Sequence, residues 1–217
     1  MSGIFSYNNK FFQFVSKLVD IFCVSMLWVV GCIPVFTIGA SSTALYYTVN
    51  KVIHHERGYL WKEFWGAFRS NFKQATLLWM GFLGFAILMW VDQFIMSLFM
   101  EDGSPLGYVG YFFLIMFWLT WLVWLFVYPN IARFENTSKA ILKNAVLMMV
   151  AHFPYTLLLV VCLLILLLIT WGIPALAVIM PALFSSVQNS IMERIFRKYM
   201  SPEDLAREDE KNREYQN

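Results

Sequence analysis

This sequence has little charge and few cysteines for its length, and each shortage excludes a class of protein. Asp, Glu, Lys and Arg together make up only 14% of the 217 residues, whereas 59% are hydrophobic. A soluble domain carries about a quarter charged residues, so the composition predicts an integral membrane protein. The cysteines, Cys23, Cys32 and Cys162, lie in apolar runs without the spacing of metal ligands. This pattern argues against a disulfide framework and against a metal site.

The chain also lacks the combinations of side chains that are typical of active sites. It has only three histidines, and two of them, His54 and His55, are adjacent. Adjacent helical residues point about 100° apart, so the His-His-Glu sequence predicts a solvated helix end rather than a metal site. No Ser/His/Asp or Cys/His arrangement and no phosphate-binding glycine loop can be built from this sequence. We therefore expect no enzymatic activity, no cofactor and no bound metal.

Long apolar runs dominate what is present, and several reach the ~20 residues needed to cross a bilayer. The region after Pro34 is less ordinary, because residues 39–44 are all small or hydroxylated. Either this region prolongs the first membrane helix, or the chain turns at Gly31–Pro34 and returns as a second helix. Small and hydroxyl residues allow helices to pack closely in lipid. The other expected spans are Ala75–Phe99, Gly107–Tyr128, Ala145–Trp171 and the shorter Pro174–Val187.

The distribution of the basic residues predicts the orientation. All 16 Lys and Arg residues fall in four segments, 10–17, 51–73, 133–143 and 194–213. Because basic loops stay in the cytoplasm, six helices with both termini inside would place every basic residue on the cytoplasmic side. Five helices are the alternative, and they would place Lys10 and Lys17 outside. We expect six.

A weak internal repeat supports this number of helices. Each proposed outer turn contains a glycine followed by a proline, and the glycines, Gly31, Gly103 and Gly172, are 72 and 69 residues apart. The segment from Lys73 resembles the segment from Lys143, seventy residues later. The pattern predicts an all-α membrane helix bundle of three helical hairpins.

The stretch from Tyr59 to Gln74 has apolar residues at helical spacing and charged residues on the other face, which predicts an amphipathic helix at the cytoplasmic side. Such a helix next to a membrane span can anchor the protein at the bilayer surface. It can also dock another protein. The docking candidates are Trp61, Phe64, Trp65, Phe68, Arg69 and Lys73.

Asp92 and Gln93 form the one polar pair well inside an expected span. An acidic residue within the membrane is a candidate for substrate contact, an ion pathway or a bond between helices. However, the run that contains it is longer than the ~20 residues required, so Asp92 can also lie near the outer interface.

Several of these segments together resemble the bacterial YesL family, a domain family of unknown function. They are PVFTIGASSTALYY from Pro34, KVIHHERG, EFWGAFRSNFKQATLLW and YPNIARFENTSKAILKNAVLM. The resemblance extends to about residue 200, which separates a membrane helix bundle (1–200) from a charged cytoplasmic tail (201–217). In this tail, Ser201 followed by Pro202 is a good helix start. The resemblance implies a multi-pass plasma-membrane protein encoded near carbohydrate ABC importers and their regulators, and it implies no catalytic residues.

We therefore expect a non-enzymatic accessory or regulatory component of a carbohydrate ABC uptake system. It would pack beside permease subunits in the bilayer, present cytoplasmic helices to a partner, and bind no nucleic acid. The alternative is a small stand-alone transporter or substrate-binding membrane protein that uses Asp92 and the hydroxyl-rich helix at 37–48. A more remote alternative is an enzyme acting on lipid-linked sugar.

Overall fold

The computed structural model describes residues 10–101 and 104–214, and within these ranges every regular element is a helix, which confirms the all-α class. Here η1, η3 and η4 are 3-10 helices, and η2 is a π-helix. In chain order the elements are α1 (Lys10–Cys32), η1 (Val35–Thr37), α2 (Ile38–Thr48), η2 (Val49–His54), α3 (Leu60–Glu101), η3 (Pro105–Val109), α4 (Gly110–Arg133), α5 (Ser138–Ala151), α6 (Phe153–Gly172), η4 (Pro174–Val178), α7 (Met180–Phe196) and α8 (Pro202–Glu214).

Three helix pairs, α1–α2, α3–α4 and α6–α7, are joined by turns of the same kind. Each turn contains a 3-10 helix that directly follows or begins with a proline, namely Pro34, Pro105 or Pro174. Proline suits this position because its φ is already helical and it has no N–H that would lack a partner in a first turn. Proline-containing turns therefore connect these three helix pairs, as the sequence predicts; Gly103 of the middle turn lies outside the described residues.

The short helix α2 lies at the centre of the fold and packs against α1, α3, α4 and α7. The chain turns at Pro34 and returns as a second helix, which decides between the two alternatives for this region. Nine of the eleven residues of α2 are buried, including Gly39 and Ala40. A Cβ atom added to Gly39 would lie 2.5 Å from the carbonyl oxygen of Ala75 in α3. The small residues thus allow two backbones to approach closely, as expected for helices in lipid.

Four segments are long and apolar enough to cross a membrane: Val15–Cys32, Leu60–Met100, Pro105–Arg133 and Phe153–Gly172. Large apolar side chains on these helices remain exposed, for example Phe94 at 59% and Leu168 at 72%. An apolar surface of this extent is typical of helices that face lipid. The segments predicted as the second and sixth spans are shorter helices. The second is α2, of 11 residues, extended by the π-helix η2; the sixth is divided between η4 and α7.

The prediction of one continuous helix from Ala145 to Trp171 is wrong. The structure has α5 ending at Ala151 and α6 beginning at Phe153, with His152 outside helical geometry between them. Pro154 explains the break, because it has no N–H to donate to the carbonyl of Val150 and its ring would clash with that carbonyl in a continuous helix.

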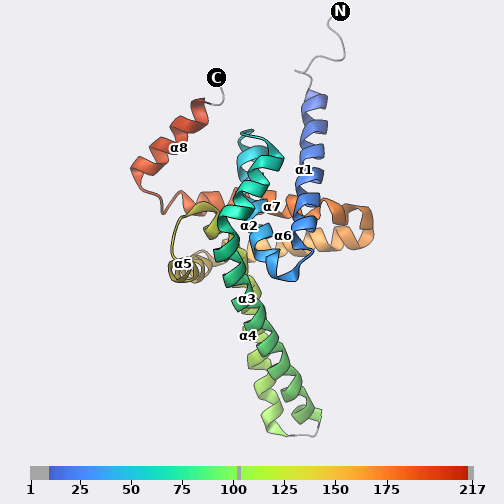
Figure 1. Ribbon diagram of the computed structural model, residues 1–217. Coiled ribbons are helices and arrows are strands. Elements are labelled where there is room, and N and C mark those ends of the chain that lie inside the picture. The colour runs from blue at the N-terminus through green and yellow to red at the C-terminus, as the bar shows by residue number, and fades with distance from the viewer. Residues whose placement is uncertain (1–9, 102–103, 215–217) are drawn as a thin grey trace, which may run out of the picture.

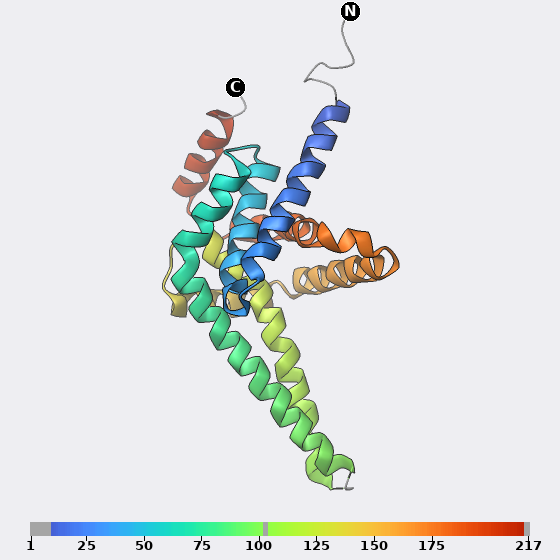
Figure 2. The same cartoon turned by 45° about the vertical axis from the view of Figure 1, so that its right-hand side comes forward.

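Figure 1 shows that the hairpin of α3 and α4 projects away from the rest of the molecule, and that α6 and α7 run across its direction. The same crossing is seen in Figure 2, so the candidate spans do not share one direction. The first turns of α1 and α3, together with α8, lie at the end of the molecule opposite the α3–α4 turn. Helix α8 begins as predicted, since Ser201 Oγ accepts a hydrogen bond from the backbone N–H of Asp204 at 3.2 Å.

Candidate functional site

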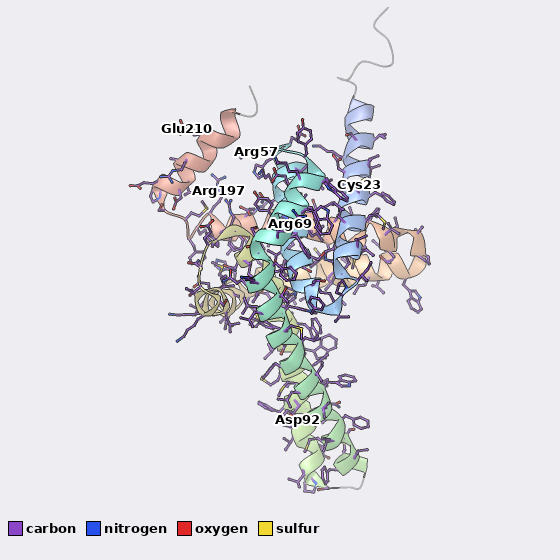
Figure 3. All side chains as sticks on the ribbon, in the orientation of Figure 1. Cys23, Arg57, Arg69, Asp92, Arg197 and Glu210 are labelled. Atoms are coloured by element: carbon purple, nitrogen blue, oxygen red, sulfur yellow. The ribbon has the colours of Figure 1, made fainter. Side chains whose placement is uncertain are left out.

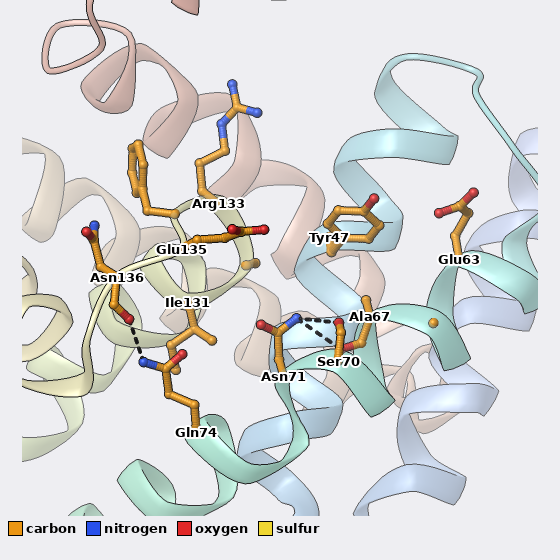
Figure 4. Close-up of a pocket in the computed structure, with 13 residues that line it drawn as sticks. Tyr47, Glu63, Ala67, Ser70, Asn71, Gln74, Ile131, Arg133, Glu135 and Asn136 are labelled. Atoms are coloured by element: carbon orange, nitrogen blue, oxygen red, sulfur yellow. Dashed lines mark hydrogen bonds between the residues drawn. The ribbon is translucent and has the colours of Figure 1, made fainter.

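A polar cleft of about 700 Å³ lies between the first part of α3 and the end of α4 with the loop that follows it (Figure 4). Its walls combine carboxylates, amides, hydroxyls, a guanidinium group and two aromatic rings. The lining residues are Tyr47, Glu63, Gly66, Ala67, Ser70, Asn71, Gln74, Ile131, Ala132, Arg133, Phe134, Glu135 and Asn136.

One wall is a stripe along α3. Its residues from Glu63 to Gln74 recur every three or four positions, so they share one face of the helix. Ser70 Oγ and Asn71 Nδ2 both donate to the carbonyl oxygen of Ala67, at 3.1 and 3.0 Å. These bonds fix both polar side chains at the cleft surface, as Figure 4 shows. At Gly66, an added Cβ atom would have no neighbour within 4 Å, so this wall is open there.

The opposite wall is the end of α4 and the following loop. Gln74 Nε2 donates to the carbonyl oxygen of Asn136 at 2.7 Å and to Ser138 Oγ at 3.4 Å. This link joins the two walls across one end of the cleft, and it connects residues far apart in the sequence. Arg133 on the same wall forms an ion pair with Glu193 of α7 at 3.4 Å.

An ion pair borders the cleft on the side of α2 and η2. Lys51 Nζ lies 2.7 Å from Glu63 Oε2 and donates to Tyr47 Oη at 3.3 Å. Burial alone would lower the pKa of Lys51, but the hydrogen bonds to Glu63 and Tyr47 outweigh it and raise the pKa above its ordinary value. Lys51 therefore keeps its charge and holds η2 against α3.

A buried polar network behind the cleft joins α2, α4 and α7. Tyr46 Oη donates to Glu193 Oε1 at 3.2 Å, and Glu193 also pairs with Arg133. Tyr128 Oη donates to the side-chain oxygen of Gln188, whose Nε2 donates to the carbonyl oxygen of Leu125 at 2.6 Å. Asn189 Nδ2 donates to the carbonyl oxygen of Tyr46 at 3.3 Å. Such links are favoured in an apolar surrounding, where polar groups without partners are costly.

Sequence analysis missed this network because the last span was expected to end at Val187. The available signal was the spacing of Ser185, Gln188 and Asn189 with Met192, which places them on one side of a helix. All four residues are buried.

The structure does not bring the six docking candidates together on one exposed face. Helix α3 continues without interruption past Ala75, so the amphipathic stretch is the first part of a 42-residue helix. Phe64 is fully buried among residues of α1 and α2, and is not available to a partner. Trp65 and Phe68 are half-buried. The exposed candidates are Trp61, Arg69 and Lys73.

The polar pair Asp92–Gln93 lies far from the cleft, on the projecting part of α3 (Figure 3). Both side chains are half-buried, and neither forms a hydrogen bond or ion pair with another residue that the structure describes. Asp92 is nine positions before the last residue of α3, Glu101, toward the end of the hairpin.

The Ser and Thr hydroxyl groups of α2 do not line the cleft, because the fold uses them internally. Ser41 Oγ donates to the carbonyl oxygen of Trp28 at 2.9 Å, and Thr43 and Thr48 donate to carbonyls one turn earlier. Across the described ranges, no three His, Cys, Asp or Glu side chains are grouped closely enough to hold a metal ion. The chemistry on view at the cleft is hydrogen bonding and charge pairing.

Comparison with known families matches residues 21–93 to the family described as "Protein of unknown function, DUF624". The matched segment includes α2 and the α3 wall of the cleft, but not the α4 wall. No curated protein and no solved structure matches the chain. From the first candidate span to Gln93, the chain is therefore similar to a family of unknown function.

Proposed function

We propose that this chain is an accessory component of a carbohydrate ABC uptake system in the bacterial plasma membrane. Its polar cleft receives a cytoplasmic segment of a partner, such as a permease subunit. The observation that carries this proposal is the open cleft of about 700 Å³ between α3 and α4, next to the segments that contain the basic residues.

The orientation in this proposal has both termini in the cytoplasm, with six spans arranged as three hairpins. The first turns of α1 and α3 lie with α8 at one end of the molecule (Figure 1), and each of these segments contains at least one Lys or Arg. The opposite end, at the α3–α4 turn, has acidic residues and no basic ones. The rule that basic segments stay inside supports the cytoplasmic placement of the cleft. Helices α2 and α7 are the shorter members of their hairpins.

The chemistry of the cleft suits a polypeptide segment. An incoming chain presents backbone N–H and C=O groups in alternation, and the amides of Asn71, Gln74 and Asn136 contain both donors and acceptors. Glu135 and Arg133 add both charge signs at one wall. A surface of this kind provides the hydrogen bonds of a specific interface rather than large apolar burial.

The experiment fills the cleft without disturbing the packing. Gly66 lines the cleft and has open space where a side chain would begin, so Gly66→Phe should fold and occupy the cleft. Copurification from native membranes, followed by mass spectrometry, should recover importer subunits with the wild-type chain and lose them with Gly66→Phe. Gly84→Phe is the matched control, since Gly84 is on the same helix, is equally open and lines no part of the cleft. Recovery of the importer by both variants would contradict the proposal.

A second candidate, a solute-binding membrane protein, is favoured by the volume of the cleft. Small-molecule sites usually measure ~300–1,000 Å³. The Tyr47 and Phe134 rings beside amides and carboxylates also suit a polyhydroxylated solute. In this case the purified chain alone should be stabilised against heat by a sugar, and Gly66→Phe should abolish that effect while partner recovery is unchanged. Neither Asp92 nor the Ser and Thr hydroxyls of α2 are part of the cleft lining.

A further inference from the structure

A second, apolar groove of about 420 Å³ lies between the α3–α4 hairpin and α5. It is separate from the polar cleft, and its lining is almost entirely hydrocarbon. The lining residues are Leu77, Leu78, Gly81, Phe82, Phe85, Met116, Leu119, Thr120, Val123, Leu142 and Val146. The single hydroxyl group, on Thr120, donates to the carbonyl oxygen of Met116 at 2.8 Å. The groove thus offers an apolar surface without a polar group that requires a ligand.

Both helices that contribute the outer walls of this groove, α3 and α5, carry lysines close in sequence to its lining residues. The bond between Gln74 and Ser138 at 3.4 Å holds the first residue of α5 against α3. Lys73 adjoins Gln74 on α3, Lys139 adjoins Ser138 on α5, and Lys143 follows Lys139 one turn later. All three lysines are exposed, and none forms an ion pair with a carboxylate among the residues that the structure describes.

Helical spacing continues each wall from lysine to hydrocarbon. On α3, Lys73 precedes the groove residue Leu77 by four positions, so the two lie on the same side of the helix one turn apart. On α5, Lys139 precedes Leu142 by three positions, and Lys143 precedes Val146 by three. Each of these two helices therefore carries a lysine within one turn of apolar groove residues and on the same side of the helix.

We propose that this groove binds an anionic phospholipid, with an acyl chain along the apolar lining and the phosphate between Lys73, Lys139 and Lys143. The match of charge identifies the occupant, because basic groups beside membrane helices attract anionic headgroups. The apolar walls gain the favourable burial of hydrocarbon. A zwitterionic phospholipid fits the groove equally well, but its headgroup is attracted less strongly by the lysines.

The test uses the full chain purified in detergent and two phospholipids with identical acyl chains, phosphatidylglycerol and phosphatidylcholine. Native mass spectrometry should show phosphatidylglycerol retained at least about tenfold more strongly. Replacing all three lysines (Lys73→Gln, Lys139→Gln and Lys143→Gln) should remove that preference. The matched control (Lys62→Gln, Arg69→Gln and Lys198→Gln) removes the same charge at exposed positions that do not line the groove. This control should retain the preference for phosphatidylglycerol. Equal retention of both lipids by the wild-type chain would overturn the proposal.

A groove-filling variant tests the acyl chain separately from the headgroup. Gly81 lines the groove and has no atom within 4 Å of an added Cβ, so Gly81→Leu should fold and lose both lipids. Position 84 is equally open but lies outside the lining, so Gly84→Leu should bind both lipids as the wild-type chain does.

Glycerol 3-phosphate should not compete with the lipid. If it displaces the lipid completely, the site is a phosphate site and the proposal fails. It also fails if Gly81→Leu converts a lipid-free dimer to a monomer, since the occupant is then a second copy. Gly66→Phe leaves the lipid site intact, so this test is independent of the polar cleft.

Discussion

At the residue scale, the packing of α2 depends on the small volume of its side chains. Gly39 lies where a Cβ atom would be 2.5 Å from both the carbonyl oxygen of Ala75 and the Cβ of Trp79. Trp79 also donates from Nε1 to the carbonyl oxygen of Val35 at 2.8 Å, which fixes its ring beside α2. Neither neighbour can move far, because one is backbone and the other is held by a hydrogen bond. Close packing at this point therefore requires glycine.

Replacing Gly39 with leucine, or Ala40 with phenylalanine, should destabilise the fold. Overpacking of a tight interior costs about 1–3 kcal/mol, and here one of the groups in the way is a backbone carbonyl. The measurement is the melting temperature and the folded yield in detergent. Gly84→Leu is the control, since nothing lies within 4 Å of its added Cβ atom. Unchanged melting of both substituted chains would mean that α2 does not pack as described.

We expect His54 to make the stability dependent on pH. Its Nε2 atom lies 3.0 Å from Ser186 Oγ of α7. Burial, together with the nearby His55 and Lys17, lowers the pKa of His54 below the ordinary value of 6.5, against a smaller opposite effect of the bond to Ser186. A folded-state pKa below the unfolded one means that the unfolded chain binds the proton more readily. Stability is then greatest above about pH 6.5 and falls as the pH drops below it.

The variant His54→Asn should reduce this decline. Thermal melting of the wild-type and variant chains between about pH 7.5 and 5 would show a smaller loss in the variant. Identical slopes in the two chains would show that His54 does not contribute.

At the scale of elements, the sequence was informative wherever one local signal decided the structure. The Gly–Pro turns and the return of α2 follow from residues within a few positions of the turn. The break at His152 also had a local signal in Pro154, but the apolar run on both sides concealed it. The 59–74 stretch was expected to be an amphipathic helix at the cytoplasmic side, but its role as a wall of the cleft had no local signal, because the opposite wall comes from α4.

The cleft itself could not be predicted from the sequence. Its walls are joined by the bond between Gln74 and Asn136, which are 62 residues apart, and the order of helices does not determine which faces meet. The network on α7 had a spacing signal in Gln188 and Asn189, but their partners on α2 and α4 are identified only by the packing.

The ion pair between Arg133 and Glu193 should contribute to the attachment of α7 to α4. Glu193→Gln removes a carboxylate that accepts from Tyr46 and pairs with Arg133. Hydrogen bonds to charged groups contribute about 1.5–3 kcal/mol, so the variant should unfold at correspondingly lower denaturant concentration in micelles. The double variant Arg133→Met, Glu193→Met should lose less free energy of unfolding than the sum of the losses in Arg133→Met and Glu193→Met alone. Strictly additive losses would show that the two groups are not coupled.

At the scale of the whole molecule, the separation of charge from hydrocarbon is the clearest organising feature. The turn of the α3–α4 hairpin is remote from the starts of α1 and α3 and from α8 (Figures 1 and 2). The crossing of α6 over the direction of that hairpin was not foreseen, because hydropathy reports the length of a span and not its direction.

The proposed orientation predicts which positions react from outside the cell. In a chain with Cys23, Cys32 and Cys162 replaced by serine, Ser104→Cys at the α3–α4 turn should react with an impermeant thiol reagent in intact cells. Glu210→Cys on α8 should react only after the membrane is opened. Ser2→Cys and Asn217→Cys, which lie outside the described residues, should behave like Glu210→Cys. Labelling of Ser2→Cys from outside would favour five spans over six.

The continuity of α3 has a mechanical consequence. Its 42 residues form one helix about 63 Å long, with the cleft along its first third and the projecting hairpin at its far end. The helix contains no proline, which is the usual cause of a sharp kink. If it pivots near Gly39, where the backbones of α2 and α3 are in closest contact, a tilt of about 5° at the cleft displaces the far tip by several ångströms. In the proposed orientation, such a tilt would carry a change at the cleft to the tip of the hairpin at the opposite face of the membrane.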